Sequence, residues 1–242
     1  MARYVIGDVH GCSKALRSML ETLKPGSGDE VILVGDYVDR GPNSKDVVDQ
    51  LLTLQQCCEL TVLRGNHEVM LQGVTMNDMD ATTWIENGGN TTIASYGGSA
   101  TKIPSNHLDF FQGLKRYHET ETEIFVHAMY DPQQPIGEQS DELTYWTHLP
   151  KVVPAPHVSG KRIYMGHTPQ PNGEILRRSH MVVVDTYCFG GGFLTALDLE
   201  TDAIVQADRH GHVRRVPIEH LYLAALKCID WLRGKGGESE GG

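Results

Sequence analysis

Three short runs near the start of the chain contain the residue types of a metal site. They read GDVHG at Gly7–Gly11, GDYVDRG at Gly35–Gly41 and GNHE at Gly65–Glu68, and each follows a short apolar stretch. Strands that end side by side would bring the Asp, His and Asn side chains of these runs to one spot. Oxygen and nitrogen donors of this kind hold two hard or borderline divalent ions, and dinuclear sites of this type usually hydrolyse phosphoesters.

Six residues are the candidate metal ligands. Asp36 is suited to bridge two ions, because a carboxylate has two oxygens. His127 and His167 lie later in the chain, each just after an apolar stretch, which suits imidazole ligands at the rim of a site. A lone histidine in such a place is more often hydrogen-bonded than metal-bound, but three motifs in order reverse that balance. The candidates are Asp8, His10, Asp36, Asn66, His127 and His167.

The residues between these ligands could perform the chemistry. A water shared by two ions has a lowered pKa, so a metal-bridging hydroxide would be available at neutral pH to attack phosphorus in line. The leaving alkoxide then needs a proton, and His67 is the natural general acid, with Asp39 holding its imidazole in the correct tautomer. The alternative is that His67 is itself a metal ligand. Arg40 and Arg64 could clamp phosphate oxygens, with structural ion pairs as the alternative for either.

The elements that position these motifs alternate between strand and helix patterns. Apolar residues at helical spacing mark the first helix, and Asn43 or Ser44 could cap the second. This alternation implies a mostly parallel sheet with ligands at the carboxyl ends of its strands. The predicted strands are residues 4–6, 31–34 and 60–63, and the predicted helices run from about 13 to 24 and through 47–52.

The pattern changes in the second part of the chain. Residues 75–118 are predicted to form a helical insertion with loops, where substrate contacts often lie. An amphipathic helix is expected at about 218–232, before a disordered tail at 234–242. We expect one catalytic domain at 1–233, because 242 residues suit a single core. The later predicted strands are residues 124–126, 162–165, 181–184, 193–199 and 203–206.

Composition and charge exclude several partners. The formal net charge of −10 argues against a nucleic-acid surface, because phosphate backbones need a basic footprint. No apolar run reaches the ~20 residues of a membrane span, and we find no secretory signal, so no membrane partner is expected. The five cysteines show no zinc-like or framework spacing, which indicates reduced thiols in a cytoplasmic protein. The sequence leaves the oligomeric state open.

The three motifs resemble the signature of the phosphoprotein phosphatases within the calcineurin-like metallophosphoesterases. The later stretches VHA at 126–128 and GHTP at 166–169 are similar to the bacterial branch, which includes the phage lambda phosphatase. The resemblance covers about Tyr4 to Leu199. It implies an α/β (α+β) fold of four layers, an αββα sandwich with two central sheets flanked by helices. It also implies that Asp8, His10 and Asp36 bind one metal, and that Asp36, Asn66, His127 and His167 bind the other.

The resemblance further implies a serine/threonine protein phosphatase that acts on phosphorylated proteins or peptides through a His67–Asp39 dyad. We expect Mn²⁺ as the metal, with Fe and Zn²⁺ as alternatives. Two departures from the family pattern concern substrate contacts. Many relatives have an arginine in a Trp-x-Arg context where this chain has His148, which could take that place on the phosphate. Tyr187 replaces a glycine common in bacterial relatives, and it could touch substrate or simply pack.

Other activities on the same scaffold remain open. The main alternative is a hydrolase of dinucleoside polyphosphates such as diadenosine tetraphosphate, or of another nucleotide or polyphosphate. Those relatives typically read Gln for the histidine of the first motif and lack the Asp-Arg pair of the second, so His10 and Asp39-Arg40 favour a phosphomonoesterase. A calcineurin-like nuclease is disfavoured by the acidic charge. An inactive metal-binding phosphoprotein receptor would usually have lost a ligand or the acid, and all are present here.

Overall fold

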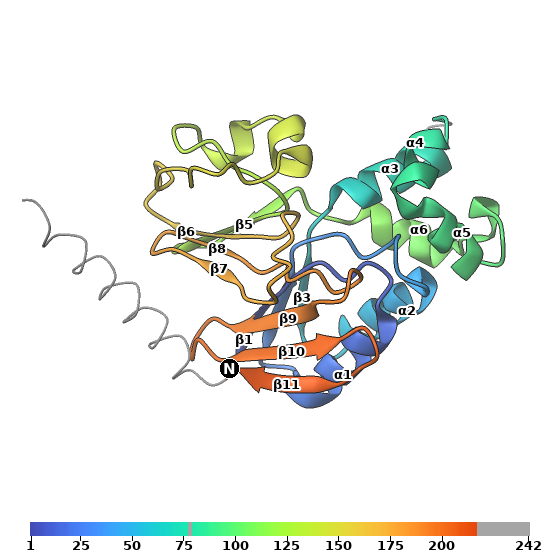
Figure 1. The fold of residues 1–242 in the computed structure, drawn as a ribbon, viewed down its shortest axis with the longest axis horizontal. Helices are drawn as coiled ribbons and strands as arrows, with labels where there is room; N and C mark the ends of the chain where they lie inside the picture. The colour runs from blue at the N-terminus through green and yellow to red at the C-terminus, as the bar shows by residue number, and fades with distance from the viewer. Residues whose placement is uncertain (77–78, 217–242) are drawn as a thin grey trace, which may run out of the picture.

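Two β-sheets form the centre of the protein, whose computed structural model describes residues 1–76 and 79–216 (Figure 1). The first sheet contains β1 (Arg3–Ile6), β2 (Glu30–Leu33), β3 (Glu59–Val62), β9 (Phe193–Asp198), β10 (Ile204–Asp208) and β11 (Val213–Val216). The second contains β4 (Tyr117–Glu119), β5 (Glu123–Val126), β6 (Arg162–Met165), β7 (Leu176–Arg177) and β8 (Met181–Val183). The strand orders are β11-β10-β9-β1-β2-β3 and β4-β5-β6-β8-β7.

The strands that precede the motifs run parallel. β1 pairs with β2 and β2 with β3, with Ile6 opposite Leu33 and Leu33 opposite Val62. In the second sheet β5, β6 and β8 are parallel, so His127 and His167 follow the carboxyl ends of adjacent strands. The remaining strands pair antiparallel, which makes both sheets mixed. Each sheet therefore delivers side chains from the ends of its parallel strands, where sites in such sheets form.

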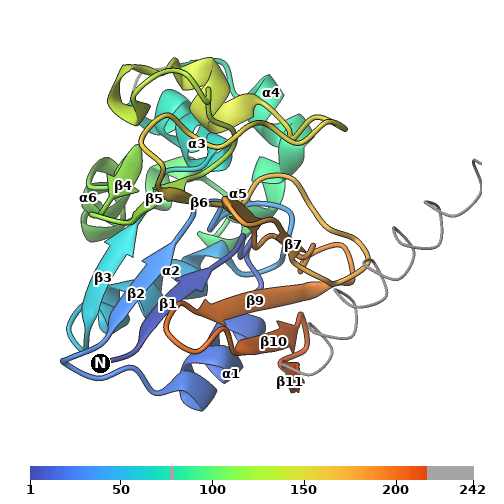
Figure 2. The same cartoon turned by 90° about the vertical axis from the view of Figure 1, so that its left-hand side faces the viewer.

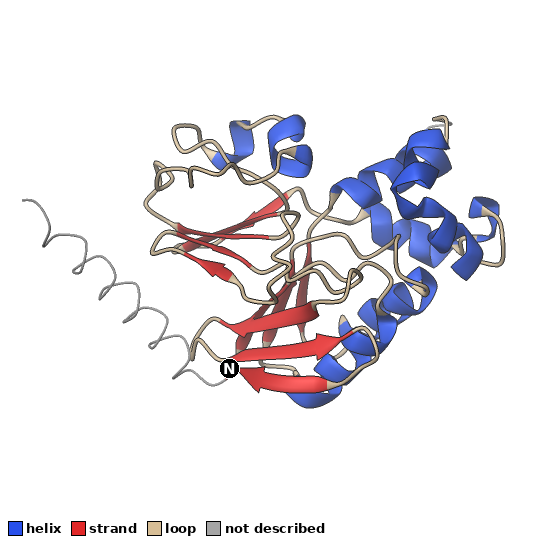
Figure 3. Cartoon of the chain, in the orientation of Figure 1, coloured by secondary structure: helices blue, strands red, loops and turns tan. Residues whose placement is uncertain are grey.

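Helices cover the outer faces of both sheets (Figures 2 and 3). α1 (Ser13–Leu23) and α2 (Ser44–Leu54) share an apolar cluster with the first sheet, to which α1 contributes Leu16 and Met19. The short helices η3 (Ile136–Glu138) and η4 (Glu142–Trp146) follow β5, and Ile136 packs on the outer face of the second sheet. The other helices are α3 (Asn66–Met76), α4 (Thr82–Trp84), η1 (Ile85–Gly89), α5 (Asn90–Ser95), η2 (Ala100–Lys102) and α6 (Ser105–Gln112).

Alternate residues of the strands face different layers. Val5 of β1 and Phe125 of β5 meet in a fully buried cluster between the sheets, whereas Ile6 faces the helices on the first sheet and Ile124 faces outward from the second. Both faces of each central strand are thus covered, which explains why these strands read as continuous apolar runs. The layers follow the order helix, sheet, sheet, helix, so the expected αββα sandwich is confirmed.

Most predicted strands and helices of the first seventy residues are found within a residue or two of their expected bounds. The short strands β4, β7 and β11 and the helix α3 were not predicted. Asn43 does precede α2, but its side chain makes no capping bond, and Ser44 instead accepts the backbone N–H of Asp39. The helix expected at 218–232 and the tail at 234–242 lie outside the described residues. No helix in the described ranges is long and apolar enough to cross a membrane.

Candidate metal centre

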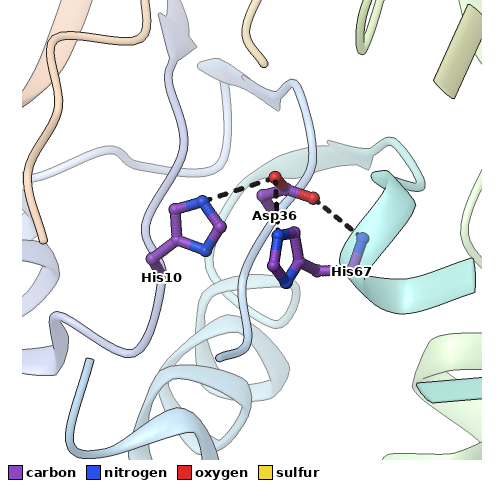
Figure 4. A group of neighbouring side chains, drawn as sticks. All are labelled: His10, Asp36 and His67. Carbon is purple, nitrogen blue, oxygen red and sulfur yellow. Dashed lines mark hydrogen bonds and ion pairs between the residues drawn. The ribbon is translucent and has the colours of Figure 1, made fainter. Parts of the chain in front are cut away.

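The first group of candidate ligand atoms comes from the loops after β1 and β2 and from the first turn of α3, which follows β3. His10 Nε2 lies 3.4 Å from Asp36 Oδ2, and His67 Nε2 lies 4.0 Å from the same oxygen (Figure 4). All three side chains are buried, and one ligand atom from each lies within 4.8 Å of the others. These three residues, far apart in the sequence, therefore form one compact set of donors.

A second group shares Asp36 with the first. His127 Nε2 lies 3.4 Å from Asp36 Oδ1, and His167 completes the buried set. Asn66 Oδ1 lies 3.1 Å from His127 Nε2 and 3.1 Å from His167 Nδ1, so it joins this group as a neutral oxygen donor. Asp36 directs Oδ2 toward the first group and Oδ1 toward the second. The arrangement is consistent with a dinuclear site in which Asp36 is the shared ligand.

Backbone carbonyls fix the tautomer of each histidine, so that the nitrogen facing the other ligand atoms carries the lone pair. His10 Nδ1 donates to the Val38 carbonyl at 3.0 Å, and His127 Nδ1 donates to the Val34 carbonyl at 2.8 Å. These bonds place the ring proton on Nδ1, so the lone pair sits on Nε2, the atom that faces Asp36. His167 shows the reverse tautomer, since its Nε2 donates to the Trp146 carbonyl at 3.1 Å and its Nδ1 faces Asn66.

The charges of the site also fit metal ions. Burial lowers the pKa of His10, His127 and His167, which keeps these ligands neutral. Burial and the negative charges of Asp185 and Asp36 raise the pKa of Asp8 well above its usual range. Buried carboxylates that repel one another, beside neutral nitrogen donors, are stabilised by divalent cations. The donor set, the tautomers and the charge together fit a pair of metals.

Asp8 and Asp185 lie in the buried region around these groups. Asp8 Oδ2 accepts the backbone N–H of His167 at 3.0 Å, so the carboxylate lies against the loop after β6. It does not belong to either three-residue group, and its role as a ligand of the first metal stays a prediction. Asp185, which the sequence did not single out as a site residue, is 3% exposed, and burial raises its pKa to about 7.

The fully buried carboxylate of Asp39 fixes the orientation of the His67 ring. His67 Nδ1 lies 2.7 Å from Asp39 Oδ2, and both side chains are 0% exposed. Asp39 also accepts hydrogen bonds from Trp84 Nε1 at 2.9 Å and from Thr92 Oγ1 at 2.6 Å. His67 Nε2 is buried and has no hydrogen-bond partner among residues 1–76 and 79–216. Burial alone would lower the pKa of His67, but the carboxylates of Asp36 and Asp39 raise it above its usual value.

Glu68 organises the loop that holds Asp36, a role that the sequence did not predict. Its carboxylate accepts the backbone N–H groups of Asp36 at 2.9 Å, Tyr37 at 2.8 Å and Gly65 at 3.0 Å. The last residue of the GNHE motif therefore ties the loop after β2 to the start of α3. The glycine at 65 is required in turn, because a Cβ there would collide with Asp36 Oδ1.

Several of these residues adopt a backbone conformation that side chains disfavour. Positive φ angles are common only for glycine and, to a lesser degree, for Asn and Asp. The loops of the site are therefore held by their surroundings rather than by local preference. The non-glycine site residues with positive φ are His10 (44°), Asp36 (55°), Asp39 (70°), Arg40 (65°), His167 (60°) and Tyr187 (66°).

The two predicted phosphate-binding arginines lie in different settings. Arg40 is exposed beside the first group, with Nη1 3.2 Å from His10 Nε2 and its guanidinium 4.7 Å from the centre of the Phe189 ring. Arg64 is half-buried and donates to the Leu114 carbonyl at 3.3 Å. Arg40 is thus placed beside the first ligand group, whereas Arg64 bonds to the segment between α6 and β4.

The other two predicted substrate contacts lie at the rim. His148 is exposed, and its ring stacks on His167 with the centroids 4.3 Å apart. Tyr187 is half-buried, with its ring centroid 4.8 Å from that of Phe189. The Phe189 ring lies 4.9 Å from the ring of His10. Tyr187 therefore adjoins the first group through Phe189, and His148 adjoins the second group directly. Contacts of either residue with substrate stay predictions.

Known proteins of two activities are similar to this chain. Serine/threonine-protein phosphatase 1 of Salmonella typhimurium is 28% identical over 205 residues, which are 79% of this chain and 89% of that protein. The symmetrical bis(5'-nucleosyl)-tetraphosphatase of Citrobacter koseri is 43% identical over 76 residues, which are 31% of this chain and 26% of that protein. The first match spans most of both chains, whereas the second is confined to about a quarter of the tetraphosphatase.

Solved structures share the fold at low identity. A crystal structure provisionally named as a diadenosine tetraphosphatase has a TM-score of 0.64 at 21% identity, covering 85% of this chain and 92% of that one. The cold-active protein tyrosine phosphatase of a psychrophilic Shewanella has a TM-score of 0.57 at 16% identity, covering 89% and 80%. The family model of the calcineurin-like phosphoesterases matches residues 1–191. That range includes every loop that supplies the two ligand groups, and the chain therefore belongs to the calcineurin-like phosphoesterase family.

Proposed function

We propose that this metal-dependent phosphoesterase is a serine/threonine protein phosphatase that acts on phosphorylated proteins or peptides. The observation that carries the proposal is the buried Asp39–His67 pair, because His67 Nε2 lies 4.0 Å from Asp36 Oδ2 and has no hydrogen-bond partner in the part of the chain that the structure describes. Serine and threonine alkoxides are poor leaving groups, so their hydrolysis depends on a positioned acid. The match to the Salmonella phosphatase over 89% of its length supports the same substrate class.

The ligand groups would hold the two metals at the carboxyl ends of the strands. When bound, the ions supply Lewis acidity and a nucleophile derived from water at neutral pH. Mn²⁺ is the metal we expect, with Fe and Zn²⁺ as alternatives that suit the same oxygen and nitrogen donors. The proposed ligands are Asp8, His10 and Asp36 for the first ion, and Asp36, Asn66, His127 and His167 for the second.

The chain's own residues orient the substrate and move the proton. Arg40 is proposed to bind a phosphoryl oxygen with its guanidinium, with Arg64, His148 and Tyr187 as further substrate contacts. Asp39 accepts the Nδ1 proton of His67, which leaves the second proton of the imidazolium on Nε2. That proton passes to the leaving oxygen as its bond to phosphorus breaks.

Turnover of a phosphothreonine peptide by the purified protein tests this proposal. We expect phosphate release that requires Mn²⁺ and stops when a chelator is added. His67→Asn is the matched variant, because it should lose most peptide turnover while it still binds Mn²⁺. A peptide rate for His67→Asn equal to that of the natural protein would refute the general-acid role. No phosphate release by the Mn²⁺-loaded protein would refute the protein phosphatase.

A hydrolase of dinucleoside polyphosphates is the second candidate. Its support is the 43% identity to the Citrobacter tetraphosphatase over 76 residues. The fold is also shared, with a TM-score of 0.64, with the crystal structure provisionally named as a diadenosine tetraphosphatase. Diadenosine tetraphosphate should be assayed with the same preparation and the same metal. Cleavage of the dinucleotide without release from the peptide would favour this candidate. Absence of both activities in a protein that binds Mn²⁺ would instead favour a receptor for phosphoproteins.

A further inference from the structure

We propose that a basic pocket beside the first ligand group binds a second anionic group of the substrate, next to the phosphoryl group that is hydrolysed. The proposal rests on the proposed function, since it concerns the substrate of the same site. We use the name basic pocket for the cavity of about 310 Å³ lined by Lys14, Arg40, Phe189, Arg209 and His210, together with the first residues of α1 and the segment before α2. A cavity of this size holds a small group rather than a folded partner.

The charge of the basic pocket is opposite to that of the protein. The chain has 31 acidic and 21 Lys and Arg residues, yet the lining includes Lys14, Arg40 and Arg209 and no carboxylate. None of these three cations forms an ion pair with a carboxylate of the described residues, and all three are exposed. Arg17, one turn further along α1, is by contrast paired with Asp46 at 2.9 Å. Cations that lack a carboxylate partner and gather around a cavity indicate that it receives an anion.

One helix end reinforces this positive field, and a second helix end borders the pocket. α1 begins at Ser13, which lines the basic pocket, and Cys12 before it makes no side-chain capping bond. The first turn of α1 therefore has N–H donors that its cap side chain does not satisfy, at the positive end of the helix dipole. At the start of α2, by contrast, the backbone N–H of Lys45 donates to Ser95 Oγ at 3.2 Å and Asp46 adds a negative charge. The three cations carry the inference, and the start of α1 adds to them.

The basic pocket shares a wall with the first ligand group. Arg40 lines the pocket, and its Nη1 lies 3.2 Å from His10 Nε2. Phe189 also lines the pocket, and its ring lies 4.9 Å from the His10 ring. A substrate whose phosphoryl group lies at the ligand groups would therefore reach the pocket with its neighbouring group. Arg40 lies between the two, where it can contact both anions.

The chemistry of the pocket defines the substrate more narrowly than the catalytic groups do. On a protein substrate, the second anion is an acidic or phosphorylated residue close to the phosphoserine or phosphothreonine. A polyphosphate chain offers the same anionic chemistry on a nucleotide. Both sources predict that a single phosphomonoester without a second charge uses the ligand groups alone.

A double variant tests the basic pocket without altering the catalytic groups. Lys14→Gln with Arg209→Gln removes two cations from the lining. Lys24→Gln with Arg215→Gln is the matched control, because it removes the same charge from exposed positions outside the lining. Lys24 caps the end of α1 and lies ten residues beyond Lys14, about 15 Å along the helix axis. That separation exceeds the Debye length of about 10 Å at 0.1 M salt.

The readout is kcat/KM for substrates that differ only in a second charge. Two phosphothreonine peptides, one with two aspartates beside the phosphothreonine and one with two alanines, are compared with p-nitrophenyl phosphate. We expect the natural protein and the control to prefer the acidic peptide on the order of tenfold, an effect that weakens in high salt. The pocket variant should lose most of this preference and keep its rate on p-nitrophenyl phosphate within about twofold.

Two results would overturn the inference, and a third arm separates it from the proposed function. The inference fails if the natural protein shows no preference for the second charge, or if the pocket variant keeps that preference. If neither peptide is hydrolysed, the proposal that this protein is a protein phosphatase is refuted. The same variants are then compared on diadenosine tetraphosphate and p-nitrophenyl phosphate. A selective loss on the dinucleotide supports the pocket with polyphosphate as its anion, and no selective loss refutes it.

Discussion

Replacing Asp39 by asparagine should weaken the acid without disturbing its position. Asp39 Oδ2 accepts from His67 Nδ1 at 2.7 Å, and Oδ1 accepts from Thr92 Oγ1 at 2.6 Å. Trp84 Nε1 donates to both oxygens, at 2.9 Å to Oδ2 and 3.0 Å to Oδ1. An asparagine oxygen in the Oδ2 position keeps both nitrogen donors. Its amide NH₂ then faces the Thr92 hydroxyl, which can accept as well as donate. The backbone tolerates the change, because asparagine adopts positive φ readily and Asp39 has φ of 70°.

The main effect of Asp39→Asn is therefore to remove the negative charge beside His67. A hydrogen bond to a charged group contributes about 1.5–3 kcal/mol. In Asp39→Asn that support for the protonated ring of His67 is largely removed, and its pKa falls from the raised value that Asp36 and Asp39 now maintain. If the lost support appears fully in the transition state, turnover of a threonine phosphoester falls by a factor of about 10 to 150.

Two substrates distinguish this effect from general damage. The leaving group of a phosphothreonine peptide is the threonine alkoxide, which needs a proton from the acid. The leaving group of p-nitrophenyl phosphate is a stabilised phenolate, which needs that proton little. We expect the full loss in kcat on the peptide and less than about a threefold loss on p-nitrophenyl phosphate. Mn²⁺ content and the unfolding midpoint, measured on the same preparations, should match those of the natural protein.

An equal loss on both substrates would refute this reasoning, since it would place Asp39 in the support of the ligand groups rather than of the acid. An unchanged rate on the peptide would also refute this reasoning, because proton donation by His67 would then not depend on the carboxylate bonded to its Nδ1. Asp39→Asn with reduced Mn²⁺ content would indicate that His67 acts as a ligand, which its position in the first group allows.

Four further outcomes follow from the geometry. Glu68→Gln turns an NH₂ group toward backbone donors in either orientation, so urea denaturation should show a loss of about 2–4 kcal/mol, and a loss below about 1 would contradict the role of Glu68. Trp84→Phe removes one donor from Asp39 and should lower peptide turnover about three- to tenfold at unchanged Mn²⁺ content; an unchanged rate would show that this donor is dispensable. Tyr187→Gly relieves a φ of 66° and should raise the unfolding free energy by about 1 kcal/mol; a lower thermal midpoint would contradict this and show that the contact with Phe189 outweighs the strain. Removing the metals with a chelator should abolish turnover and lower the thermal midpoint, and added Mn²⁺ should restore both; a midpoint that does not move would contradict coupling of metal binding to stability.

The sequence predicted the strands, and it predicted that His10, Asp36, His127 and His167 lie together, for one physical reason. Each of these residues follows an apolar strand within a few positions, so a local pattern places it at the end of a sheet. The first group differs from the expected set, because it contains His67 in place of Asp8. His127 and His167 were found in the same way, although they are far from the first motifs. The β7 strand has only two residues, Leu176–Arg177, and its pairing depends on β8 rather than on its own pattern.

The support behind the acid could not be predicted from the sequence. Trp84 lies 45 residues from Asp39 and Thr92 lies 53 residues from it, in a segment without regular periodicity. Their contacts exist only because the segment folds back over the loop after β2. Glu68 was visible in the GNHE motif, but its role depends on backbone N–H groups that no sequence pattern reveals. Lys14 and Arg209 likewise meet only in the folded chain.

The residues with positive φ limit how small a protein could be and still hold this site. A non-glycine residue held at positive φ costs of the order of 1 kcal/mol or more. Six such residues lie in or beside the ligand groups, so the site opposes folding by several kcal/mol, against a usual net stability of about 5–15 kcal/mol for a domain. The two sheets must therefore supply stability that the loops lack. A miniature scaffold that kept the three N-terminal motifs but lost the second sheet would relax these backbones to ordinary conformations, and the ligands would no longer converge.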